Sequence, residues 1–100
     1  MELIFNEQDL VDSVCVYTSV REKARPEQVE ADLEFNPDFG FAATALVYGR
    51  QVRLNEQDVI DAVSIYLRDY HQFHPDRLLV NLSFSEAEGF SASIQVRNNY

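Results

Sequence analysis

Two histidines and their acidic neighbours are the residues whose type and spacing most nearly match a metal site. His71 and His74 have the His-x-x-His spacing of zinc ligands, and Asp69 and Asp76 lie beside them. A tetrahedral zinc site needs further ligands, and no cluster of cysteines supplies them. Histidines near the carboxyl end of a helix are also favoured by the helix dipole. We therefore expect no metal and no cofactor, and we keep His71 and His74 only as candidate ligands.

A tetrapeptide that occurs twice offers carboxylates for acid–base chemistry or for a divalent cation. Asn-Glu-Gln-Asp stands at residues 6–9 and again at 55–58, followed by Asp12 and by Asp61. Asn with an acid three residues later is typical of a capped helix start. Asp12 and Asp61, one turn further on, are expected to face solvent, where like charges give nothing to the helix. They are candidate cation ligands, but Ca²⁺ prefers six or more oxygens, so we expect no metal there.

No arrangement of residues in the sequence predicts catalysis. The single cysteine, Cys15, lies between Val14 and Val16 in a helical apolar pattern, which is typical of a small packed residue rather than a nucleophile. The chain has no glycine-rich phosphate loop, no Gly-x-Ser-x-Gly motif and no Cys-x-x-Cys pair. We therefore expect that the protein is not an enzyme.

Charge and composition exclude several classes of partner. The chain has 100 residues and a net charge of −9, whereas nucleic acids and anionic membranes are bound by cationic surfaces. No segment approaches the roughly 20 apolar residues of a membrane-spanning helix. The first residues, Met1–Phe5, do not resemble a signal peptide, and one cysteine cannot form an intrachain disulfide. We expect a cytoplasmic protein with neither a nucleic acid nor a membrane as partner.

The sequence contains an internal repeat that determines its organisation. Residues 3–49 align without a gap onto residues 52–98, and 14 of the 47 pairs are identical. Neither unit is large enough to bury an apolar face by itself, so we expect the two to fold together. The prediction is a single domain over residues 1–100, built from repeats at 2–49 and 51–98.

Each repeat shows the same succession of patterns. A short apolar strand (2–5 and 51–54) precedes a helix that should run to about residue 22 or 71, and a proline closes the connection that follows. Strict alternation at 29–35 and at 78–84 indicates half-buried strands, each returning through a short loop into a second strand. The fold class is therefore α+β, a tandem β-α-β-β repeat.

The expected sheet is mostly antiparallel, with both helices packed on one face; two three-stranded halves are the alternative. Pairing Phe35 with Phe41 keeps both apolar sets on one side. A type II′ turn at Gly49-Arg50 would pair Tyr48 with Gln51 and place Arg53 opposite Leu46. By pseudo-symmetry, the strand at residues 2–5 should pair with the strand near residues 90–97.

The two repeats differ on one strand face, which is the clearest functional clue in the sequence. Residues 42, 44, 46 and 48 point outward as Ala, Thr, Leu and Tyr, where the second repeat has Ser, Ser, Gln and Arg. An outward Leu and Tyr on one copy indicate a covered surface. Scattered exposed apolar residues are the ordinary alternative. The interaction-face candidates are Ala42, Thr44, Leu46, Tyr48 and Arg53.

An acidic row lies beside this face. Glu30, Asp32 and Glu34 alternate along the neighbouring strand, and Arg53 and Arg97 are the cations expected near them. Cross-strand neutralisation would make the row structural. Binding of a cationic ligand or a basic partner is the alternative.

The opening residues 1–9, the hairpin at 47–51 and the segment 54–58 resemble the YxcD-like family of short proteins from Bacillus-type bacteria. The resemblance covers nearly the whole chain. It implies a bacterial cytoplasmic protein of unknown function and transfers no catalytic or binding residue. We expect a non-catalytic module that binds another protein or its own copy; the alternative is a small-molecule or divalent-metal binding protein that uses the acidic residues.

Overall fold

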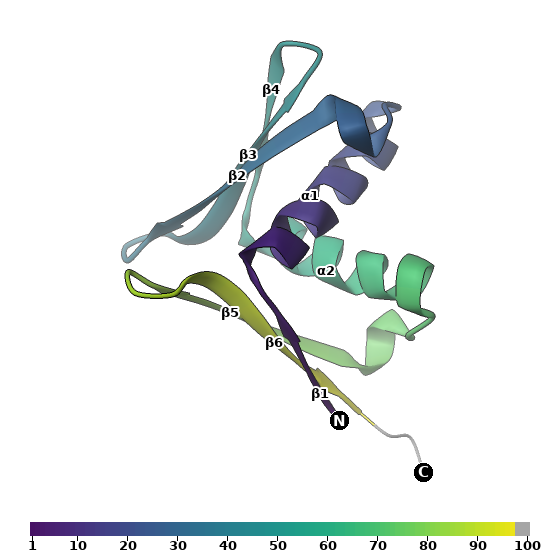
Figure 1. The fold of residues 1–100 in the computed structure, drawn as a ribbon, viewed down its shortest axis with the longest axis vertical. Coiled ribbons are helices and arrows are strands. Elements are labelled where there is room, and N and C mark those ends of the chain that lie inside the picture. The colour runs from purple at the N-terminus through teal and green to yellow at the C-terminus, as the bar shows by residue number, and fades with distance from the viewer. Residues whose placement is uncertain (98–100) are drawn as a thin grey trace.

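The computed structural model describes residues 1–97 and contains two α-helices, six strands and two short 3-10 helices, η1 (Pro26–Gln28) and η2 (Pro75–Arg77) (Figure 1). The elements follow the predicted order, and both helices end at the predicted residues. The last position of the second predicted repeat, residue 98, lies outside the described part. The elements are β1 (Glu2–Phe5), α1 (Glu7–Glu22), β2 (Val29–Asn36), β3 (Gly40–Val47), β4 (Arg50–Leu54), α2 (Glu56–His71), β5 (Leu78–Ser85) and β6 (Gly89–Val96).

The strands form two antiparallel three-stranded sheets, which is one of the two arrangements expected. Their strand orders are β1-β6-β5 and β2-β3-β4. The opening strand of each repeat is therefore paired with the hairpin of the other repeat. Figure 1 shows the sheets diverging from their hairpin tips, with α1 and α2 in the opening between them. No helix within residues 1–97 is long and apolar enough to cross a membrane.

The pairing of β3 with β4 corrects our prediction of the register. Val47 pairs with Arg50, so that Tyr48 and Gly49 form a two-residue turn instead of Gly49 and Arg50. Both turn residues have positive φ, 51° and 78°, as in a type I′ turn. The predicted partner of Tyr48, Gln51, pairs with Leu46. The error is a shift of two residues, which leaves every side chain on its predicted face because strands have a period of two.

The core consists of two clusters, and each takes side chains from both helices. The first contains Val14 of α1 with Val59 and Ala62 of α2, packed against β3 and β4. The second contains Leu10 of α1 with Val63 and Leu67 of α2, packed against β1, β5 and β6. The helices cross between the sheets, so neither repeat has a core of its own.

The recurring tetrapeptide caps both helices, as predicted. The Asp9 amide donates to Asn6 Oδ1 (2.8 Å), and the Asn6 amide donates to Asp9 Oδ2 (2.9 Å). Asn55 and Asp58 repeat this reciprocal pair at 2.8 and 3.0 Å. Such caps each stabilise a helix by about 1 kcal/mol.

The glutamate of each tetrapeptide links its helix to the hairpin of the other repeat. Glu7 Oε1 accepts a hydrogen bond from the Phe90 amide (3.1 Å), and Glu56 Oε1 accepts one from the Phe41 amide (3.0 Å). The hairpin tips also meet directly, because the rings of Phe35 and Phe84 stack with their centroids 5.4 Å apart. These contacts connect the two repeats at the closed end of the opening (Figure 1).

Glycine at the start of β3 and of β6 suits the backbone conformation, and any side chain there would have to displace the carboxylate of the linking glutamate. Gly40 and Gly89 have φ of +83° and +76°, and a Cβ at either would lie 2.6 or 2.7 Å from Oε1 of the linking glutamate. Gly49 has a similar φ (+78°) but nothing within 4 Å of its would-be Cβ. We expect Gly40→Ala and Gly89→Ala to lower the free energy of unfolding by about 2 kcal/mol, because the new Cβ also pushes the glutamate carboxylate off the backbone amide that it accepts from. The control Gly49→Ala has only the backbone cost, about 1 kcal/mol. Urea unfolding measures this difference; equal losses in all three variants would contradict it.

One buried hydroxyl predicts a substitution that stabilises the protein. Thr18 is 1% exposed, and its Oγ1 has no hydrogen-bond partner among the described residues. The repeat-related residue is Leu67, which is buried in the second cluster. We expect Thr18→Val to raise the free energy of unfolding by about 1 kcal/mol, because it removes an unsatisfied polar atom at nearly constant volume.

The matched control for this variant is Ser19→Ala. The Ser19 hydroxyl is also buried but donates to the Val16 carbonyl oxygen (2.7 Å), so its removal brings no such gain. A thermal melt of both variants makes the comparison. A lower Tm for Thr18→Val than for the unmodified protein would show that the hydroxyl is satisfied in solution.

Candidate functional site

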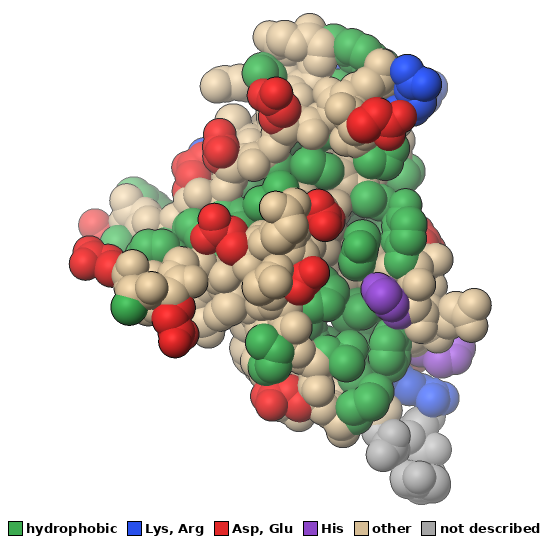
Figure 2. Space-filling model, viewed as in Figure 1, with side chains coloured by type: hydrophobic (Ala, Val, Ile, Leu, Met, Phe, Trp, Pro, Cys, Tyr) green, Lys and Arg blue, Asp and Glu red, His purple; other side chains and the backbone are tan. Residues whose placement is uncertain are grey.

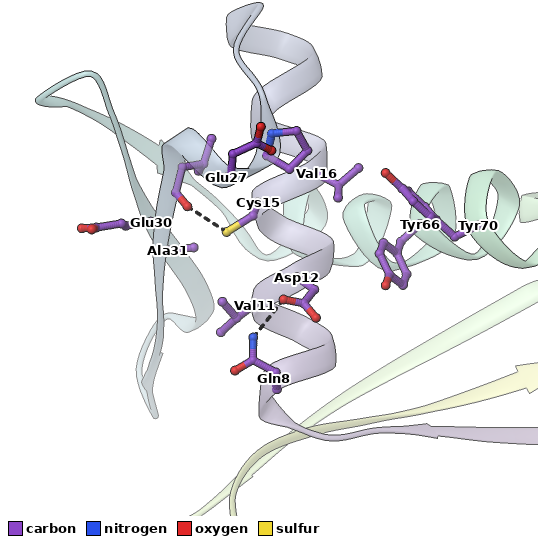
Figure 3. Close-up of a pocket in the computed structure, with 12 residues that line it drawn as sticks. Gln8, Val11, Asp12, Cys15, Val16, Glu27, Glu30, Ala31, Tyr66 and Tyr70 are labelled. Atoms are coloured by element: carbon purple, nitrogen blue, oxygen red, sulfur yellow. Dashed lines mark hydrogen bonds between the residues drawn. The ribbon is translucent and has the colours of Figure 1, made fainter.

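A groove lies between α1, the segment that leads into β2, and α2 (Figure 3). Its volume is about 630 Å³. The residues that line it include three carboxylates and no lysine or arginine. Figure 2, from the same direction as Figure 1, shows hydrophobic side chains in a band over the helices, acidic side chains across the face, and Lys and Arg at its margins. The groove is therefore partly apolar, and its unpaired negative charge is that of Asp12, because Glu27 pairs with Arg25 (3.5 Å) and the Glu30 carboxylate points away.

Two tyrosines of α2 form one wall of the groove. Tyr66 and Tyr70 are one helical turn apart, and their rings stack with a centroid distance of 4.8 Å and an interplanar angle of 23°. Tyr70 remains 56% exposed, so the aromatic surface is open to a ligand. Stacked aromatic rings offer a planar electron-rich face that attracts cations as well as apolar groups.

Asp12 supplies the charge opposite these rings. Its side chain lines the same groove from α1 (Figure 3), and its Oδ1 accepts a hydrogen bond from Gln8 Nε2 (2.9 Å). Burial raises the pKa of Tyr66, and the nearby carboxylates of Asp12 and Asp9 raise it further. The negative potential at the tyrosine pair thus comes from the first turns of α1.

Asp12 and Asp61 have the same role in the two repeats. Each side chain is half-buried and accepts a hydrogen bond from the glutamine one turn before it, at 2.9 Å in both repeats. Within residues 1–97, no three His, Cys, Asp or Glu side chains come close enough together to hold a metal ion. The divalent-cation alternative therefore gains no support from the geometry.

The histidines lie apart from any set of ligands in the described residues. His71 is the last residue of α2, and its ring lies 5.8 Å from that of Tyr66. His74 follows in the connection to β5. The nearby Asp69 forms an ion pair with Arg68 instead; Arg68 Nε lies 2.8 Å from Asp69 Oδ1.

Cys15 also lines the groove but is unsuited to nucleophilic chemistry. Its thiol points away from the tyrosines and donates to the Val29 carbonyl oxygen (3.4 Å; Figure 3). Burial, and secondarily the Asp12 carboxylate, raises the pKa of the thiol. The sulfur is therefore protonated at neutral pH, whereas a nucleophilic cysteine must be a thiolate.

The predicted interaction face contains a polar network that links three neighbouring strands. Arg53 lies opposite Thr44, not Leu46, and its Nη1 is 2.6 Å from Glu34 Oε1. The Thr44 hydroxyl donates to Glu34 Oε2 (2.5 Å). These hydrogen bonds, mainly that from Arg53, hold the pKa of Glu34 below its usual range. The network ties β2, β3 and β4 together; Arg97, the other expected cation, follows β6 of the other sheet.

The apolar residues of this face are separated from one another. Leu46, 39% exposed, pairs with Glu30 on one side and Gln51 on the other. Ala42 lies opposite Glu34. Tyr48 belongs to the β3–β4 turn, and its hydroxyl donates to Gln28 Oε1 (2.6 Å).

The acidic row is only partly neutralised. Glu34 is paired with Arg53, whereas no ion pair within residues 1–97 includes Glu30 or Asp32. Figure 3 shows the Glu30 carboxylate pointing away from α1 and from the tyrosine pair. Its charge therefore belongs to the outer face of the sheet.

Our reading of the sequence missed the tyrosine groove. Its signal was present in the spacing of Tyr66 and Tyr70, two aromatics one turn apart, and in Arg21, which occupies the position of Tyr70 in the first repeat. Nothing in the linear sequence indicates that Asp12 of the other helix faces this pair.

Comparison with known proteins identifies a family without an assigned activity. The family described as "Protein of unknown function (DUF2653)" matches the chain twice in succession, over residues 1–53 and 49–100, as the repeat requires. The chain is also similar to "Uncharacterized protein YxcD" of Bacillus subtilis (strain 168), with 50% identity over 46 residues. That alignment spans 45% of this chain and 45% of YxcD. No solved structure matches. The chain belongs to the DUF2653 family, as its resemblance to YxcD-like proteins indicated.

Proposed function

We propose that the protein is a non-catalytic interaction module that binds a basic segment of a partner protein in the groove between its helices. The observation that carries this proposal is the tyrosine pair facing Asp12 in a groove of about 630 Å³ whose lining has no cation. The net charge of −9 favours a basic partner and accelerates its approach.

The properties of the groove agree with binding rather than catalysis. A catalytic site needs a nucleophile, or an acid and base whose pKa values suit proton transfer. The candidate nucleophile, Cys15, is protonated and bonded to a backbone oxygen. The groove instead offers an open aromatic surface and fixed negative charge, which suit recognition of a cationic side chain.

The groove is a better candidate than the face predicted from the sequence. On that face Glu34 is already bonded to Thr44 and Arg53, so its charge is compensated, and only Glu30 and Asp32 lack an ion pair among the described residues. In the groove, Asp12 has a neutral hydrogen-bond donor and no ion pair among the described residues. A basic side chain would therefore gain a carboxylate there without displacing an existing cation.

The repeat provides a matched test. The ligand is a capped peptide with two arginines and two lysines, titrated into the ¹⁵N-labelled protein. Its binding should shift the NMR amide resonances of α1 and α2 around the groove. We expect Asp12→Asn to weaken this binding about fivefold, because it removes one ion pair and keeps an acceptor for Gln8. Asp61→Asn makes the same chemical change at the equivalent position of the other repeat and should leave the affinity unchanged.

The two variants separate local from general electrostatics. If both weaken binding equally, the peptide responds only to net charge and the groove is not the site. Peptide shifts confined to the outer face of β2, β3 and β4 would place the interaction on the face predicted from the sequence. Light scattering of the free protein identifies a second copy as the occupant if its mass doubles with concentration and Asp12→Asn prevents this.

A further inference from the structure

We infer that the side chain recognised in the groove is arginine, whose guanidinium stacks on the tyrosine pair and pairs with the two carboxylates near Tyr66, those of Asp12 and Asp9; this inference rests on the proposed function. The repeat itself points to this side chain. The other half of the molecule already holds a guanidinium between a tyrosine of one helix and an aspartate of the other.

The internal example is Arg21. Its Cζ lies 5.3 Å from the centroid of the Tyr17 ring, and its Nη1 lies 3.4 Å from both Tyr17 Oη and Asp58 Oδ1. Tyr17 and Arg21 are on α1, whereas Asp58 begins α2. A guanidinium is thus held by cation–π attraction and by a carboxylate across the helix pair.

The second half keeps this arrangement but lacks the guanidinium. At the repeat offset of 49 residues, Tyr66 corresponds to Tyr17 and Asp9 to Asp58, while Tyr70 replaces Arg21. Asp58 uses Oδ2 for its cap and Oδ1 for Arg21. Asp9 likewise uses Oδ2 for its cap, and no hydrogen bond within residues 1–97 involves its Oδ1.

The pKa shifts of Tyr17 and Tyr66 reflect the difference in charge between the two halves of the molecule. Burial and the carboxylates of Asp58 and Asp61 raise the pKa of Tyr17, and Arg21 opposes this rise. At Tyr66, burial and the carboxylates of Asp12 and Asp9 act in the same direction, and no cation opposes them. The second half therefore has an uncompensated negative charge where the first half has its own arginine.

Tyr70 makes the site selective for a planar cation. Its ring extends the aromatic surface of Tyr66, so a ligand meets a stacked pair rather than one ring. A guanidinium is planar and weakly hydrated, and it can stack on a ring while donating to a carboxylate at its edge. The lysine ammonium is a compact, strongly hydrated charge that cannot do both.

The first measurement compares three capped peptides that differ only at the central residue of Gly-X-Gly, where X is arginine, lysine or citrulline. Resonance shifts of the ¹⁵N-labelled protein would give the affinities. We expect the arginine peptide to bind at least about threefold more tightly than the lysine peptide, because only the guanidinium stacks. Citrulline keeps the planar shape without charge and should bind more weakly than either.

A self-filling variant provides the second measurement. Tyr70→Arg recreates in the second half the arrangement of Arg21, so its own guanidinium should occupy the site and abolish binding of the arginine peptide. Val20→Arg is the control: Val20 is on α1, 71% exposed and outside the groove lining, and the change in net charge is the same. It should bind the peptide like the unmodified protein.

The outcomes distinguish this inference from the proposed function. Equal affinity for arginine and lysine peptides, both weakened by Asp12→Asn, would overturn arginine recognition while the groove remained a basic-segment site. Undiminished binding by folded Tyr70→Arg would also overturn it. If neither these peptides nor the mixed basic peptide shifts the groove resonances, both proposals fail.

Discussion

The structure depends on the exchange of one strand between the two repeats. β1 pairs with β6, and β4 pairs with β3, so each three-stranded sheet contains strands from both repeats. A two-stranded hairpin by itself is marginal in water, and the third strand and the helices together make each sheet stable. Because β1 leads into α1 and β4 leads into α2, the exchange places both helices between the sheets. The shared cores and the glutamate links follow from that placement.

Duplication also explains how one groove can acquire a function. The helix caps, the linking glutamates and the glycines that open β3 and β6 are the same in both copies. Residues at the helix crossing differ between the copies. The Arg21 guanidinium occupies the tyrosine–aspartate site of the first repeat, whereas the equivalent residue of the second repeat, Tyr70, brings no guanidinium. A change at one position of one repeat alters the surface without disturbing the strands or caps, since these are specified elsewhere in the chain.

Ion pairs neutralise some carboxylates at the surface of the sheet, but they do not neutralise Asp12 in the groove. The outer face of β2–β4 neutralises Glu34 with Arg53, and Arg50 pairs with Glu22 beside the β3–β4 turn. The groove has no such compensation at Asp12. An acidic protein with a partly neutralised surface attracts basic groups most strongly where carboxylates remain unpaired, and in the groove such a carboxylate lies beside an aromatic surface.

The sequence by itself determined the repeat, the order of elements, the helix caps and the inward faces of β2 to β6. These features are local: capping needs residues three apart, and strand faces need only alternation. It could not determine the β3–β4 register, because a shift of two residues preserves every face, nor decide between one sheet and two. Only the tertiary structure decided that Arg53 neutralises Glu34, and that Asp12 faces Tyr66 and Tyr70. Asp12 and the tyrosines lie on different helices, and their approach is set by how α1 and α2 cross between the sheets, which no local pattern encodes.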